Sequence, residues 1–119
     1  MIKAINRSLL TVTVALCGVA NSAVASTSAY VTSGTLTKTV DQCLDQMRSI
    51  AQKTGFTLAQ QTVMDNNGKA GDFHADQAST SLHFTARCNS VSKTWAVAVS
   101  GINSNETFIQ YKKFYDLLP

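Results

Sequence analysis

The chain has 119 residues, of which 45% are hydrophobic and 14% are charged, with one proline and a formal net charge of +3 at pH 7. This length accommodates a single domain. The composition is too apolar for a disordered chain and lacks the glycine or proline bias of fibrous proteins, so we expect a folded globular protein.

The first 25 residues have the layout of a secretory signal peptide. Lys3 and Arg7 form a positive start, residues 9–16 are mostly apolar, and residues 23–25 read Ala-Val-Ala, a cleavage motif. A membrane span needs about 20 apolar residues, more than this run provides. We therefore expect residues 1–25 to be removed and residues 26–119 to form one exported domain, periplasmic or secreted and not inserted in a membrane.

Two further points concern this leader. Cys17 raises the alternative of a lipoprotein, although the residue before it, Leu16, is larger than the small residue that normally precedes a lipidated cysteine. Loss of Lys3 and Arg7 leaves eight of the ten Lys and Arg residues against seven Asp and Glu. A nearly neutral chain lacks the clustered cations that phosphate backbones require, so nucleic acid is not the expected partner.

Two cysteines remain after the predicted cleavage, Cys43 and Cys88. An even number of cysteines in an exported chain indicates a disulfide, and neither belongs to a C-x-x-C redox motif. We predict that Cys43 and Cys88 are bonded to each other for structural reasons.

The first half of the expected domain contains a weak edge strand and a well-marked helix. Residues 30–36 favour a strand but are interrupted by a glycine. Thr39 and Gln42 have the spacing of a capping box, and Gly55 is a natural helix end. Apolar residues recur between them at helical spacing: Val40, Cys43, Leu44, Met47, Ile50 and Ala51.

Three strands are expected next, with a hairpin between the second and the third. Residues 56–64 form the first strand and residues 65–71 a turn-rich loop. With residues 77–80 as the hairpin loop, the expected directly opposed pairs are Phe73 with Phe84, Ala75 with Leu82 and His74 with His83.

Period-two alternation divides this hairpin into two faces. The apolar face carries Phe73, Ala75, Leu82, Phe84, Ala86 and Cys88, and the polar face carries Asp72, His74, Asp76, Ser81, His83, Thr85 and Arg87. Cys88 therefore points inward, as Cys43 does on the helix, which agrees with a bond between them.

Residues 93–101 are expected to form a further strand, and Asn103 or Ser104 to cap a last helix. The expected order is β-α-β-β-β-β-α. This predicts a small α+β domain of two layers, an antiparallel sheet with a helix packed on one face and attached by the disulfide.

The polar face of the hairpin suggests a metal site. Directly opposed residues of antiparallel strands lie close together, so His74 and His83 would reach one ion, with Asp72 or Asp76 supplying oxygen. Two imidazoles and a carboxylate suit zinc or copper. The alternative is an ordinary solvated sheet face, which carries the same residue types.

No motif identifies a catalytic nucleophile or a pair of catalytic carboxylates, so we expect a protein that is not an enzyme. The last helix carries aromatic side chains on more than one face, among them Phe108, Tyr111 and Tyr115. Some of these pack in the core, and the rest would offer a contact surface. The sequence therefore favours recognition of another protein, as an inhibitor or accessory factor, with divalent-metal binding as the alternative.

Overall fold

The computed structural model describes residues 27–118, so the predicted signal peptide and Cys17 lie outside the described residues. The order of elements follows the sequence prediction. The elements are β1 (Ser28–Thr35), α2 (Val40–Lys53), β2 (Phe56–Met64), β3 (Ala70–Gln77), β4 (His83–Asn89), β5 (Thr94–Gly101) and α3 (Ser104–Tyr115).

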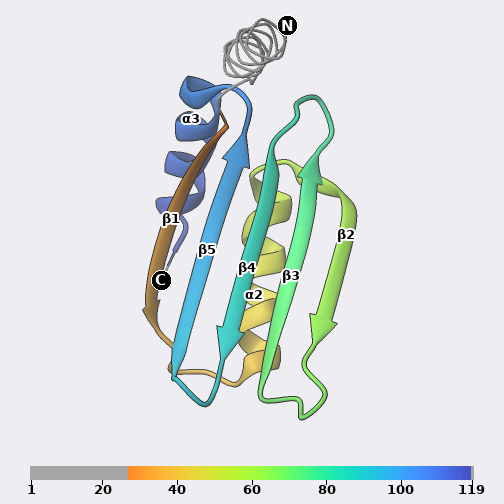
Figure 1. Cartoon of the computed structure of the whole chain (residues 1–119), viewed down its shortest axis with the longest axis vertical. Helices are drawn as coiled ribbons and strands as arrows, with labels where there is room; N and C mark the ends of the chain where they lie inside the picture. Colours follow the sequence, from red (N-terminus) through yellow and green to blue (C-terminus); the bar gives the residue numbers. More distant parts are fainter. Residues whose placement is uncertain (1–26, 119) are drawn as a thin grey trace, which may run out of the picture.

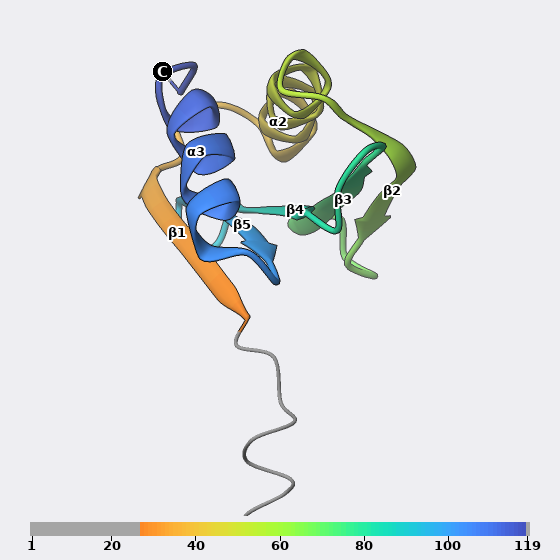
Figure 2. The ribbon, with the colours of Figure 1, turned by 90° about the horizontal axis from the view of Figure 1, so that it is seen from above.

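The five strands form one antiparallel sheet in the order β1-β5-β4-β3-β2 (Figure 1). Both helices lie on the same face of this sheet (Figure 2). α2 packs on β2, β3 and β4, and α3 packs on β1 and β5. The predicted two-layer α+β domain is thus confirmed, and neither of the two described helices lies on the second face of the sheet, which we call the helix-free face. Within residues 27–118, no helix is both long and apolar enough to cross a membrane.

The start of α2 is fixed by the predicted capping box. The Gln42 backbone N–H donates to the Thr39 hydroxyl, and the Thr39 N–H donates to the Gln42 side chain, both at 3.2 Å. These bonds satisfy backbone groups that a helix start otherwise leaves without partners. The buried residues of α2 are the six that the helical spacing selected: Val40, Cys43, Leu44, Met47, Ile50 and Ala51.

The disulfide joins Cys43 of α2 to Cys88 of β4, with the two Cα atoms 6.2 Å apart. Both cysteines are buried in the core between helix and sheet. The predicted pairing is confirmed, and with it the placement of both sulfurs in the inner layer.

The predicted pairing of the β3–β4 hairpin is wrong by two positions. In the structure Ala75 opposes Phe84, His74 opposes Thr85 and Asp76 opposes His83. The cause is the loop, which spans residues 78–81 because the Leu82 carbonyl accepts a bond from the Gln77 N–H. A displacement of two residues keeps each side chain on its face, so the predicted inner and outer sets remain correct.

Candidate functional site

The helix-free face of the sheet carries the polar residues that the sequence singled out. His74 Nδ1 lies 3.2 Å from Thr85 Oγ1, and His83 Nδ1 lies 2.6 Å from Asp76 Oδ1. The two imidazoles are diagonal neighbours rather than directly opposed, but their rings stack with centroids 5.8 Å apart and planes 25° apart. The face therefore brings His74, His83 and Asp76 together.

Asp72, the fourth predicted metal ligand, lies in an ion-pair network on the same face. Arg87 Nη1 donates to both carboxylate oxygens of Asp72, at 2.9 and 3.0 Å, and Arg87 Nη2 donates to Asp65 at 2.9 Å. The hydrogen bonds that Arg87 donates to Asp72 and Asp65 raise the pKa of its guanidinium group. This cation is therefore neutralised by two carboxylates. Residues 27–118 contain no group of three His, Cys, Asp or Glu side chains arranged to hold a metal ion.

The predicted contact residues of α3 form an aromatic cluster with the edge strand. The Tyr30 ring of β1 lies 5.3 Å from the Phe108 ring and 5.5 Å from the Tyr111 ring, and Tyr111 lies 5.9 Å from Tyr115. Tyr30 also comes within 3.4 Å of the Ser104 hydroxyl at the start of α3. We call Tyr30, Phe108, Tyr111 and Tyr115 the aromatic cluster. It anchors α3 at the free edge of the sheet.

The members of the aromatic cluster differ in exposure. Tyr111 is partly buried and packs against the core, whereas Phe108 is 45% exposed and Tyr115 is 51% exposed. Ile109 and Leu117, which are also large and apolar, are exposed nearby. Buried Phe114, on the opposite side of α3, packs edge-on against Phe84 of the sheet. The helix thus serves both the core and an apolar surface.

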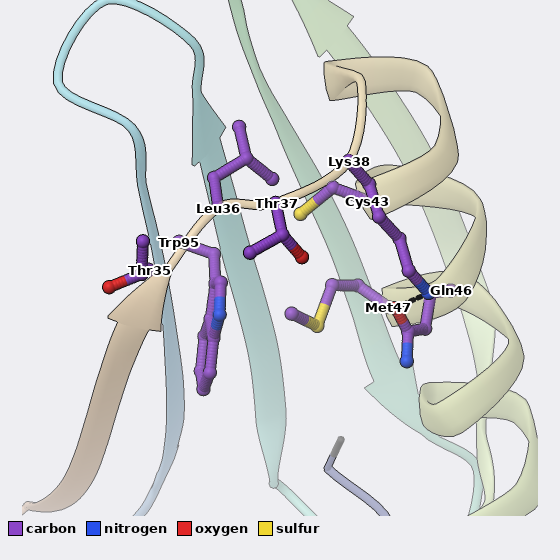
Figure 3. A pocket seen from close by; sticks show the side chains of 8 residues that line it. All are labelled: Thr35, Leu36, Thr37, Lys38, Cys43, Gln46, Met47 and Trp95. Atoms are coloured by element: carbon purple, nitrogen blue, oxygen red, sulfur yellow. Dashed lines mark hydrogen bonds between the residues drawn. The ribbon is translucent and has the colours of Figure 1, made fainter.

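Trp95 lies between the two helices and lines two recesses. The first, shown in Figure 3, has a volume of about 60 Å³ and lies among Trp95, Leu36 and Met47, with Lys38 and Gln46 at its rim. Lys38 Nζ donates to Gln46 Oε1 at 2.9 Å. This volume is well below the ~150 Å³ of a cavity that binds benzene, so the recess is too small for an organic ligand.

The second recess is larger and shares only Trp95 with the lining of the first. It has a volume of about 260 Å³, and its lining residues are Thr32 and Ser33 of β1, Trp95 of β5, and Tyr115 and Leu118 at the end of α3. We call it the Trp95 notch. Since β1 is an edge strand, the notch lies beside the free edge of the sheet.

Gly34 makes room for the Trp95 ring. Gly34 and Trp95 are directly opposed on β1 and β5, and a Cβ atom at Gly34 would lie 2.4 Å from the Trp95 ring. The indole therefore occupies the place of the missing side chain. From the sequence, Gly34 is expected only to interrupt the strand, and Tyr30, Trp95 and Leu118 are not predicted as surface residues. Pairing between β1 and β5 brings them there, and no local pattern reports that pairing.

The chain was compared with protein-family models, with curated proteins and with solved structures, and none of the three comparisons gave a match.

Proposed function

We propose that this chain is a small exported protein, periplasmic or secreted, that recognises another protein as an inhibitor or accessory factor and is not an enzyme. The observation that carries the proposal is the exposed half of the aromatic cluster. Phe108 and Tyr115 expose large apolar area at the sheet edge, where Tyr30 and Tyr111 connect them through ring-to-ring contacts. Contiguous exposed apolar area of this kind marks interaction sites, and interface cores are enriched in tyrosine and phenylalanine.

The geometry of the cluster supports recognition as well as apolar contact. The rings of Phe108 and Tyr115 are held by Tyr30 and Tyr111 through ring-to-ring contacts, so part of their freedom is already lost before any partner arrives. Ordering such side chains on binding then costs less conformational entropy. The disulfide supports an oxidising compartment, because such bonds persist outside the cytosol.

The proposal is tested by photo-crosslinking in the cells that make the protein. A photoreactive phenylalanine analogue is placed at Phe108 or Tyr115, with Ser49 of α2 and Gln61 of β2 as exposed controls. We expect one protein to be linked from both aromatic positions and from neither control. The proposal would be contradicted if one or both aromatic positions gave no adduct. It would also be contradicted if all four positions gave the same adducts.

The alternative function, divalent-metal binding, is favoured by one observation. Nδ1 of His83 faces Asp76 and Nδ1 of His74 faces Thr85, which leaves Nε2 of each imidazole without a partner among these contacts. A carboxylate that orients an imidazole in this way is common around metal ligands. Titration of the metal-free protein with zinc at neutral pH tests it. A tight 1:1 complex that His83→Ala abolishes would support this function, and no binding would exclude it.

A further inference from the structure

The edge strand β1 carries none of the features that protect a sheet edge. Its sequence, Ser-Ala-Tyr-Val-Thr-Ser-Gly-Thr, contains no charged residue and no proline. Natural edge strands are usually blunted by charges, prolines, bulges or a covering element, because their open backbone groups pair readily with another strand. α3 covers the face of β1 and leaves its edge open, as the view along the sheet shows (Figure 2).

The opposite edge, β2, is irregular in contrast. Its pairing with β3 shifts register between Phe56 and Leu58 and again between Leu58 and Gln61. Ala59, between these shifts, has a φ of 49°, which interrupts the extended backbone. Bulges of this kind turn an edge away from further pairing. Only one of the two edges of this sheet is therefore regular over its whole length.

The hydrogen-bond pattern identifies the open groups of β1. Leu36, directly after the strand, donates its N–H to the Lys93 carbonyl at 2.8 Å. Alternate residues of an antiparallel strand direct their backbone groups to opposite sides. Even-numbered residues of β1 therefore bond to β5, and Ala29, Val31 and Ser33 direct N–H and C=O groups to the free edge. Their side chains lie on the helix-free face and are small or, at Val31, 64% exposed.

The Trp95 notch provides a place for a side chain of an added strand. Side chains of directly opposed residues lie on the same face, so a strand placed beside β1 would project the side chain opposite Gly34 toward Trp95, Tyr115 and Leu118. The notch volume of about 260 Å³ exceeds the ~150 Å³ cavity that binds benzene. None of the lining residues is charged. Thr32, Ser33 and Tyr115 contribute polar atoms, and Trp95 and Leu118 form an apolar wall against which an aromatic side chain can pack.

We propose that the protein partner supplies an extended, uncharged segment that pairs with β1 as an added strand and inserts an aromatic or branched apolar side chain into the Trp95 notch. This inference rests on the proposed function and names its mode of recognition. Backbone hydrogen bonds to Ala29, Val31 and Ser33 provide affinity, and the notch provides specificity, as in other complexes formed by strand addition. Phe108 and Tyr115 then flank the bound segment.

The test uses a synthetic peptide and the fluorescence of Trp95, which is the single tryptophan of the chain. The peptide is acetyl-Thr-Val-Thr-Val-Thr-Phe-Thr-Val-Thr-Val-Thr-amide, long enough to reach Ala29 when its central Phe lies opposite Gly34. It is added to the disulfide-bonded protein purified from the compartment in which it accumulates. We expect a saturable shift of Trp95 emission to shorter wavelength as the notch loses water. Replacing the central Phe of the peptide by Ser is expected to weaken binding about tenfold or more.

Two variants at one position separate strand pairing from surface contact. Val31→Pro removes an edge N–H that β5 does not use, and proline is tolerated at such positions of edge strands. We expect it to abolish saturable binding. Val31→Ala, the matched control, keeps the N–H and is expected to bind within about fivefold of the wild type, the usual limit for a cross-strand contact. Thermal unfolding of both variants checks that the fold is retained.

Three results would overturn the inference. The first is no shift at about 1 mM peptide, the weakest affinity that a specific contact would give. The second is equal binding by Val31→Pro and Val31→Ala. The third is a Trp95 emission that shifts with protein concentration alone, together with a dimer mass, which would mean that a second copy pairs with β1. Photo-crosslinking from Phe108 is a separate measurement that does not depend on strand pairing. The proposed function can therefore be supported or contradicted whatever the peptide experiment shows.

Discussion

At the scale of single residues, Gly34 determines how the edge strand meets its neighbour. The Trp95 indole fills the space above Gly34, where a Cβ atom would be 2.4 Å from Cζ2 and 2.6 Å from Cε2 of the ring. Aromatic residues opposite an edge glycine compensate for the packing that the glycine lacks. The contact closes the end of the sheet core and forms the wall of the Trp95 notch.

Gly34→Val is therefore expected to destabilise the domain by about 1–3 kcal/mol, the usual cost of overpacking. The added side chain forces the indole away from β1. Ser33→Val is the control, because the adjacent side chain lies on the helix-free face and is exposed. Denaturant unfolding followed by Trp95 fluorescence measures both free energies of unfolding. Equal stability of the two variants would mean that Trp95 does not need the space above Gly34.

The exposure of two tyrosines separates their roles. Tyr111 packs against the core and stacks on Tyr30, whereas Tyr115 is 51% exposed. Tyr111→Ala is expected to cost about 2–3 kcal/mol of unfolding free energy, toward the low end for an aromatic truncation because the ring is only partly buried. Tyr115→Ala should cost less than about 1 kcal/mol and weaken partner binding instead. Thermal unfolding measures the loss of stability, and the crosslinking yield from Phe108 measures partner binding. A larger loss of stability in Tyr115→Ala than in Tyr111→Ala would contradict these roles.

At the scale of elements, the disulfide attaches α2 to the sheet. Cys43 and Cys88 are 45 positions apart in the sequence, and a loop of this size is worth about 4 kcal/mol in the chain-entropy description. We expect the double variant Cys43→Ala, Cys88→Ala to lose about this much unfolding free energy. The variant is compared with the oxidised and reduced wild type by denaturant titration. A loss below about 1 kcal/mol would show that core packing holds α2 without the bond.

The sequence predicts the elements well because their signals are local. Thr39 and Gln42 mark the start of α2 within four residues, and alternation places Phe73, Phe84 and Cys88 on the inner face. The register of the β3–β4 hairpin, in contrast, has no such signal in the nearby sequence. Both the predicted loop and the observed one contain four residues. The observed loop is closed by the bond from the Gln77 N–H to the Leu82 carbonyl and by side-chain bonds of Thr80, which alternation does not predict.

At the scale of the whole molecule, the candidate surface arises from a pairing that local patterns do not reveal. The sequence places Phe108, Tyr111 and Tyr115 on one helix, but Tyr30 and Trp95 join them only because β1, the first strand, pairs with β5, the last. The two strands are separated by more than half of the domain in sequence. Alternation could identify the inner face of each strand, but not the neighbour of β1.

The arrangement of layers gives the two faces of the sheet different roles. One face is filled by α2, α3 and the core, and the other carries the Arg87 network and the stacked histidines. The exposed part of the aromatic cluster and the Trp95 notch both lie at the β1 edge, where the two faces meet. The β1 edge therefore combines a regular row of open backbone groups with exposed aromatic side chains, and we refer to it as the β1 margin.

Recognition of another protein at the β1 margin can be measured by native mass spectrometry of the protein isolated from its own compartment. The wild type is compared with the double variant Phe108→Ser, Tyr115→Ser, which changes two exposed rings and leaves Tyr111 and the core in place. We expect the wild type to carry one additional protein of defined mass, and the variant, still folded and disulfide-bonded, to carry none. A wild type that is a bare monomer, or a complex that the variant retains, would contradict it.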